Sequence, residues 1–484
     1  MAQPRGNQEE GANESGGELG KLGGRLGRMS LRKQVMTLAM WPFLEQILGF
    51  LVSAVDLIFT GRLAEGELRV AMMDAMGIGG YIAWLLMIMQ GSVGTGVMAL
   101  VSRATGAREG ALAGKALTQG LMLGLATGVL VSVVLSLLLS TIVSVFGLSD
   151  ESAEQALSYL RVLVWSAPVL GLMLVATNAL RGAGDTKTPF LAMVVVNLVN
   201  VFLSWLFVFG QEEGQGMGVA GLALGSVLGW VSGALVLIAF LLLRRDKEQG
   251  EVFLTLRGCR FYPEPEVMRR IIKVGVPQAL EMGGMWAIQS VMLGFISGLP
   301  QEGALGSHMI AIRVESMSFL PGFAIGSAGA ALVGQYLGAG SPTMAMKAAR
   351  ISWSYAAIFM SLLGLLFLSC SRELVALIVP EGPDSQHFQD LAGPLIFLCG
   401  LSQPFLATVL VMKTTMRGAG ATQLVMRYSY STMLFYRVFI IPVGVSFFGL
   451  GLTGIWVVMF IDVITQAILF SRIHFRGDWL RAKV

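Results

Sequence analysis

RGAG, at residues Arg181–Gly184, recurs at Arg417–Gly420, an offset of 236 residues (417 − 181). Each copy lies at the end of a long apolar stretch, and a second apolar stretch begins a few residues later. The same glycine-rich break at the same place in two series of apolar stretches indicates that the chain contains a repeated unit.

Two other pairs of short segments repeat in the same order around these copies. PFLE at 42–45 and PQALE at 277–281 place two glutamates 236 residues apart (281 − 45). GMGVAG at 216–221 is matched by GLGLTG at 449–454, an offset of 233 (449 − 216). Three pairs in one order at nearly one offset predict a duplicated six-helix unit.

The composition is typical of a membrane protein. Of the 484 residues, 55% are hydrophobic and 13% are charged, which is too apolar for an ordinary soluble chain. A helix needs roughly 20 apolar residues to cross the hydrocarbon core, where exposed backbone finds no water. The sequence predicts such helices near residues 36–62, 74–102, 114–146, 156–180, 187–210, 217–243, 268–298, 304–337, 346–369, 386–416, 422–447 and 451–475.

We therefore expect an all-α polytopic membrane protein, with about 12 transmembrane helices in two pseudo-symmetric six-helix bundles at 34–243 and 268–475. A cytoplasmic linker at 244–267 joins them, residues 1–33 form a disordered cytoplasmic tail, and 476–484 form a second cytoplasmic tail. An even helix number per unit makes the halves parallel repeats, which suits a central cavity that opens to each side in turn.

The connecting segments alternate in charge. Basic residues concentrate in 103–115, 181–187 and 244–273, whereas 147–155 and 210–216 contain no Lys or Arg. The second half continues the alternation with Lys347, Arg350, Lys413, Arg417 and the basic tail. By the positive-inside rule, both termini lie in the cytoplasm, and we expect a multi-pass protein of the cell (inner) membrane.

The sequence contains few signs of an enzyme. Neither GxGxxG segment follows a soluble strand, GALAGKA at 110–116 lacks the spacing and the Ser or Thr of a phosphate-binding loop, and HExxH and GxSxG are absent. The cysteines, Cys259, Cys370 and Cys399, are scattered. We expect no enzymatic activity, no cofactor and no nucleic-acid partner; a transporter without an ATP motor must couple to an ion gradient.

Coupling to ions requires ionisable groups within the membrane, where a carboxylate costs roughly 2.5–3.5 kcal/mol on insertion scales. The candidates are Glu45, Asp56, Glu281 and Glu315. Glu45 and Asp56 are 11 residues apart (56 − 45), so they share a helix face about 16 Å apart along the axis. One column would present both carboxylates to the same cavity.

Each candidate also has a structural interpretation. Asp56 could pair with a neighbour such as Arg62, and Glu315 with Arg313. Glu45 and Glu281 occupy equivalent places and are expected to face each other across the pseudo-twofold axis, as a cytoplasmic gate or an ion site.

Uncharged and basic residues complete the candidates. Asn197 and Asn200 would form interhelical hydrogen bonds, with ligation of a coupling ion as the less favoured role for Asn200. Arg161 and Arg437 are interpreted as anchors whose long chains reach the interface.

Three stretches together resemble the multidrug and toxic compound extrusion (MATE) family of cation-coupled antiporters. They are 42–61, with PFLE and Asp56; 179–186, ALRGAGDT; and 319–338, which contains FLPG and LVGQYLG. The resemblance covers about residues 36–475 and implies two six-helix bundles that export amphipathic, often cationic compounds in exchange for protons or sodium.

The resemblance also implies roles for individual residues. Asp56 matches the family's cation-coupling aspartate and Asn200 an asparagine near it. Ser204 stands where some members have a second acid, and GLSQPF at 400–405 lacks the acid of others, so a second site would depend on Glu281 and Glu315. Sodium would bind at Asp56 or Glu281, and the choice between proton and sodium stays open.

Two other functions compete with antiport. A lipid-linked precursor flippase of the same superfamily would have a strongly cationic cavity, whereas here the intramembrane acids outnumber the basic residues assigned near the axis. A membrane-embedded enzyme would need clustered catalytic groups near one membrane face. The expected partners are the lipid bilayer and small-molecule substrates, and we expect a monomer.

Overall fold

The structure is a computed structural model that describes residues 22–63, 66–146, 148–209, 217–244, 254–379, 382 and 385–482. Within these ranges, 12 helical spans are long and apolar enough to cross a membrane. The predicted outer loop 210–216 and part of the linker, 245–253, lie outside the described residues.

Six spans form the first half, and one of them is interrupted by a short 3₁₀ turn. They are α3 (Leu31–Leu63), α4 (Gly66–Gly106), α5 (Gly110–Val145), α6 (Asp150–Leu163) continued through η1 (Val164–Ser166) by α7 (Ala167–Gly182), α8 (Lys187–Phe209) and α9 (Gly218–Leu243). Every predicted helix of this half is present, and most extend a few residues beyond the predicted ends.

The second half follows the same plan with two interruptions. Its helices are α10 (Pro265–Ser297), α11 (Ala304–Gly338), α12 (Pro342–Ser369) followed by the short α13 (Ser371–Ile378), α14 (Ser385–Gly418), α15 (Thr422–Met433) continued through the π-helix η2 (Leu434–Ile440) by α16 (Ile441–Phe448), and α17 (Leu452–Arg476). The described residues contain no strand. The predicted all-α polytopic fold is confirmed.

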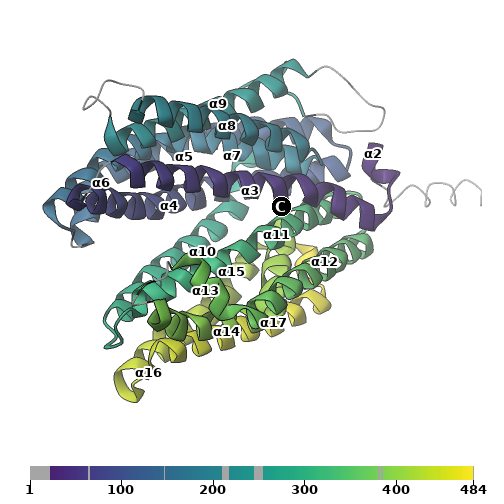
Figure 1. Cartoon of the computed structure of the whole chain (residues 1–484). Helices are drawn as coiled ribbons and strands as arrows, with labels where there is room; N and C mark the ends of the chain where they lie inside the picture. Colours follow the sequence, from purple (N-terminus) through teal and green to yellow (C-terminus); the bar gives the residue numbers. More distant parts are fainter. Residues whose placement is uncertain are drawn as a thin grey trace, which may run out of the picture.

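The two halves form two groups of helices that approach at one end of the molecule and diverge toward α6 and α16 (Figure 1). α10 packs against α4, and α11 packs against α3 and α4, so these helices build the contact between the halves. Each half also has its own buried apolar core, for example around Leu180 and Leu222 in the first half and around Leu332 and Leu395 in the second.

The RGAG repeat ends a helix in the same way in both halves. Gly184 and Gly420 have φ of +94° and +85°, a left-handed conformation that favours glycine at a helix C-terminus. Gly182 packs on the backbone of Met98, and Gly418 on that of Ala330, so a side chain would be crowded at Gly182 and would clash at Gly418. Backbone geometry thus accounts for the two glycines of RGAG in each half.

Part of the predicted disordered tail is ordered, which corrects the expectation for residues 22–33, and the second predicted tail is described as far as residue 482. The first part of the predicted disordered tail, residues 1–21, lies outside the described residues, but α2 (Gly24–Gly27) follows and α3 already begins at Leu31. At the other end, η3 (Asp478–Arg481) buries Trp479. Leu22 and Trp479 belong to one apolar cluster, so the two ends of the described chain lie together at the same end of the molecule.

Candidate functional site

The repeated glutamate, Glu45 or Glu281, forms an ion pair with the arginine of RGAG in each half. Arg181 Nη2 donates to Glu45 Oε2 at 2.6 Å, and Arg417 Nη2 donates to Glu281 Oε2 at 2.8 Å. Both pairs join residues 136 apart in sequence. The duplicated segments are therefore the two ends of a duplicated contact that ties the first helix of each half to the fourth.

The pair in the second half has additional partners. Lys413 Nζ lies 3.4 Å from Glu281 Oε1, and Ser429 Oγ donates to the same oxygen at 2.7 Å. Two cations thus share one carboxylate whose side chain is 4% exposed. Lys413 and Arg417 were counted with the basic cytoplasmic segments, but both belong to α14 and turn inward.

These contacts also change the interpretation of Glu45 and Glu281. The prediction that they face each other across the pseudo-twofold axis is not supported, because each binds an arginine of its own half. Neither carboxylate is an isolated charge. Desolvating a carboxylate is costly, and an opposite charge at hydrogen-bonding distance offsets that cost.

A second cluster surrounds Asp56 in the first half. Ser226 Oγ on α9 donates to Asp56 Oδ2 at 2.9 Å, and Asn200 Nδ2 on α8 donates to Ser226 Oγ at 2.9 Å. Asn200 Nδ2 also lies 3.4 Å from Ser204 Oγ. The structure therefore brings Asp56 and Asn200 together, with Ser226 as the link between them.

This cluster is buried but incompletely bonded. Asp56 is 5% exposed and Asn200 is fully buried, yet Asp56 Oδ1 and Asn200 Oδ1 have no hydrogen-bond partner among the described residues. Buried polar atoms are nearly always bonded, and an unpaired one costs about 1–3 kcal/mol. Within the part of the chain that the structure describes, Asp56 forms no ion pair with Arg62, so a structural ion pair does not explain this carboxylate.

Asn197 lies outside this cluster. Its Nδ2 donates to the carbonyl of Met193 one turn earlier at 2.9 Å, and its side chain is partly exposed. Asn197 therefore satisfies a bond within its own helix, rather than the interhelical bond that was predicted.

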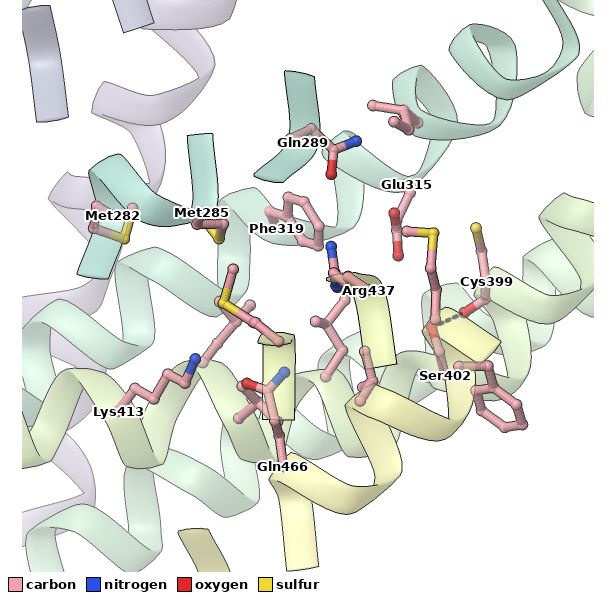
Figure 2. Close-up of a pocket in the computed structure, with 18 of the residues that line it drawn as sticks. Met282, Met285, Gln289, Glu315, Phe319, Cys399, Ser402, Lys413, Arg437 and Gln466 are labelled. Atoms are coloured by element: carbon pink, nitrogen blue, oxygen red, sulfur yellow. Dashed lines mark hydrogen bonds between the residues drawn. The ribbon is translucent and has the colours of Figure 1, made fainter. Parts of the chain in front are cut away.

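A cavity of about 370 Å³ opens among the helices of the second half (Figure 2). Its walls come from α10, α11, α14, α15, η2 and α17, with Tyr81 and Trp84 of α4 at one side. Most of the lining is apolar and rich in methionine and aromatic rings, and its charges come from Glu281, Glu315, Lys413, Arg417 and Arg437. Ligand cavities in proteins are typically about 300–1,000 Å³, with a few placed polar groups in an apolar wall.

Two predictions about charged residues here were wrong. Arg437 is not an interfacial anchor, because its Nε donates at 2.8 Å to the fully buried Asp462 on α17. Glu315 does not pair with Arg313, which is exposed, and instead points into the cavity near Arg437 (Figure 2). Residues two apart on a helix point in different directions, so the sequence neighbours could not meet.

Arg437 lies in the π-helix η2, where an extra residue per turn shifts the register of the side chains. Gln466 Nε2 donates to the other oxygen of Asp462 at 2.8 Å. Sequence reasoning missed Asp462 and Ser226. Asp462 could have been found as an acid in the middle of a predicted helix, whereas one serine in an apolar helix gives no such signal.

Comparison with known proteins accounts for the duplicated architecture. The family model MatE matches residues 42–206 and again 277–443, so its two matches begin 235 residues apart (277 − 42). "Probable multidrug resistance protein NorM" of Thermotoga maritima is 27% identical over 455 residues, which is 94% of each chain. A protein of the same name from Mannheimia succiniciproducens is 24% identical over 347 residues, covering 69% of this chain and 71% of that protein.

Solved structures share the fold. "Crystal structure of MATE in the bent conformation" superposes with a TM-score of 0.84 at 20% identity and covers 94% of this chain and 98% of that one. "Outward-facing conformation of a multidrug resistance MATE family transporter of the MOP superfamily" gives 0.82 at 20% identity, with the same coverage. The duplicated family match across most of the chain shows that this multi-pass membrane protein belongs to the MATE family of multidrug extrusion transporters.

Proposed function

We propose that this transporter exports amphipathic small molecules, cations among them, in exchange for protons or sodium ions, and that the coupling ion binds at Asp56. The proposal rests on two buried oxygens that lack a hydrogen-bond partner, Asp56 Oδ1 and Asn200 Oδ1. Other atoms of the same two residues are joined through Ser226 in one cluster. A proton bound by Asp56 or a sodium ion held by these oxygens would discharge a buried carboxylate. Oxygen ligands of this kind suit a hard cation.

The contacts favour Asp56 over Glu281 as the coupling site. Both oxygens of Glu281 already accept from cationic or hydroxyl donors, which are Arg417, Lys413 and Ser429. A second cation would have to displace one of them. Among the described residues, Asp56 has no cationic partner, so ion binding there replaces a missing contact.

Gradient-driven efflux is the direct test of this function. Purified protein in liposomes is expected to move a cationic dye against its gradient when a proton or a sodium gradient is imposed separately. A rate of dye transport that neither gradient changes would contradict ion-coupled antiport.

We also propose alternating access, with the halves closed at the end where the chain termini lie. Two reciprocal hydrogen bonds support it: Arg103 Nη2 donates to Ala419 O at 2.8 Å, and Gln335 Nε2 donates to Gly182 O at 2.8 Å. Each RGAG turn therefore accepts a hydrogen bond from the opposite half. Opening this end requires both bonds to break.

Gln335→Leu is expected to open this end more often, because leucine keeps the volume and removes the bond to Gly182, about 1 kcal/mol. Spin labels on Glu109 and Thr343, exposed residues of opposite halves, should report longer distances than in the parent protein. Gln423→Leu, at an exposed position, is the control. Identical distance distributions in all three proteins would show that the hydrogen bond from Gln335 to Gly182 does not keep this end closed.

We propose that the chain lies in the cell membrane with both termini in the cytoplasm, and that it works as a monomer. Strongly exposed apolar side chains such as Leu137, Leu243 and Leu377 fit contact with lipid. The residues of the clusters around Asp56 and Glu281 all come from one chain.

Two native cysteines test this orientation. With Cys370 as the sole cysteine, a membrane-impermeant maleimide should label intact cells; with Cys259 alone, labelling should require permeabilisation. Burial raises the pKa of the Cys259 thiol, so labelling should be done at mildly alkaline pH, where more of it is thiolate. The reverse pattern would invert the topology.

The flippase alternative needs a surplus of positive charge in the cavity. The sequence-based claim that acids outnumber bases there was wrong, since Lys413, Arg417 and Arg437 all line the cavity. Glu281 and Glu315 line it as well, and Asp462 binds Arg437, so three acids balance three bases. This balance favours export of amphipathic compounds over binding of a pyrophosphate.

A further inference from the structure

The charges of the second-half cavity balance in sum but are separated in space. Glu281 is shared by Lys413 and Arg417, which leaves one positive charge in excess where α10 and α14 meet. The Lys413 side chain is 13% exposed, and its ammonium group points into the cavity (Figure 2). This group of three residues is called the positive pole below.

The other end of the cavity has the opposite excess. Arg437 is bound by Asp462, and Glu315 has no ion-pair partner within 4 Å among the described residues. One arginine therefore faces two carboxylates, which leaves one negative charge in excess. Figure 2 shows the Glu315 carboxylate beside Arg437, on the far side of the cavity from Lys413. Glu315, Arg437 and Asp462 form the negative pole.

Apolar side chains separate the two poles. Met285 and Phe319 lie along the wall between Lys413 and Glu315 (Figure 2), and Met282 and Phe323 also line the cavity. A methionine-rich wall adapts to ligands of different shape, and aromatic rings supply flat contact area. A singly charged compound would satisfy one pole and leave the other without a partner.

We propose that this cavity binds dipolar amphipathic compounds, with an anionic group at Lys413 and a cationic group at Glu315. The proposal rests on the proposed export function and names a class of its substrates. Lys413 is the residue that distinguishes a dipolar compound from a simple cation, because Arg417 is already bound to Glu281 at 2.8 Å and Lys413 lies farther from it, at 3.4 Å.

Three probes on one tricyclic scaffold test this selectivity. Tetramethylrhodamine with a free carboxylate is dipolar, its methyl ester is a cation of nearly the same shape, and fluorescein is an anion. Binding is measured by isothermal titration calorimetry with the full chain in lipid nanodiscs and no ion gradient. Failure of ion-coupled transport would therefore leave this measurement unaffected.

The dipolar dye is expected to bind about tenfold more tightly than its ester, the contribution of one charge-assisted hydrogen bond. Lys413→Gln should abolish that difference by weakening the free acid alone, and Lys413→Arg should restore it. Glu315→Gln should weaken both rhodamines and leave fluorescein unchanged. The Arg417–Glu281 pair remains in each variant, so thermal unfolding should confirm that the variants fold.

Three results would overturn the proposal. Equal affinity of the parent protein for the free acid and the ester would show that the positive pole is not used. An equal loss of both rhodamines in Lys413→Gln would assign Lys413 a structural role. Tightest binding of fluorescein would make the cavity an anion site, which is what a pyrophosphate carrier requires.

Discussion

Asp56→Asn is expected to reduce gradient-driven efflux to the background of protein-free liposomes while the protein still folds and inserts. Asparagine keeps the size of the side chain and can accept the hydrogen bond from Ser226, but it neither titrates nor carries the charge that a sodium ion would neutralise. Exchange needs a group whose occupancy by the ion disfavours the substrate-bound state, and this variant has lost that group.

The measurement is counter-transport in proteoliposomes, with proton and sodium gradients imposed separately on parent and variant. Asp390→Asn is the matched control, because the Asp390 side chain is 57% exposed and its pair with Arg372 lies at the surface. Parent-like rates for Asp56→Asn under either gradient would exclude Asp56 as the coupling site for that ion. Loss under the sodium gradient alone, or under the proton gradient alone, would identify the ion.

Ser226→Ala refines the same test. The change removes the hydroxyl that joins Asp56 to Asn200 and leaves both amide and carboxylate in place. Because Ser226 donates to the ionised carboxylate, its loss favours the protonated form of Asp56. Under a proton gradient we therefore expect half-maximal efflux at about a tenfold lower proton concentration than in the parent, as loss of one hydrogen bond to a charged group predicts. An unchanged concentration dependence would show that Ser226 does not organise the site.

Most of the fold could be predicted from the sequence because helix number in a membrane depends on apolar length, which is read directly from the chain. The repeat of Pro42 and Glu45 at Pro277 and Glu281 also indicated the duplication. What apolar length does not reveal is rotation about the helix axis. That rotation decides whether the side chain of Lys413 points outward or into the cavity.

Only part of the candidate site could be predicted, because the sequence does not reveal how each helix is rotated. Asp56 and Asn200 were paired by resemblance, and the structure places them in one cluster, but their functional role stays a prediction. Arg437 was misplaced because the π-helix shifts its register, which a regular helical period does not anticipate. The partners of Glu281 come from residues 136 and 148 positions away, and no local pattern points to contacts so distant in sequence.

Glu281→Gln is expected to destabilise the protein by about 3–5 kcal/mol, because it strands two buried cations, Lys413 and Arg417, without their shared carboxylate. No partner of Glu281 was predicted from the sequence; its two ion pairs indicate that its replacement affects folding. Glu45→Gln, its counterpart, strands Arg181 alone and should cost less, about 1–3 kcal/mol. Midpoints of thermal unfolding in detergent compare the two.

A double variant separates charge from packing in this comparison. Glu281→Gln combined with Arg417→Gln removes a cation together with the carboxylate, and replacing both partners of a buried pair is often nearly neutral. The double variant should therefore unfold at a higher temperature than Glu281→Gln alone, a positive coupling that a double-mutant cycle measures. If the two losses simply add, Arg417 does not depend on Glu281, and the duplicated glutamate–arginine contact is not what joins the first and fourth helices of each half.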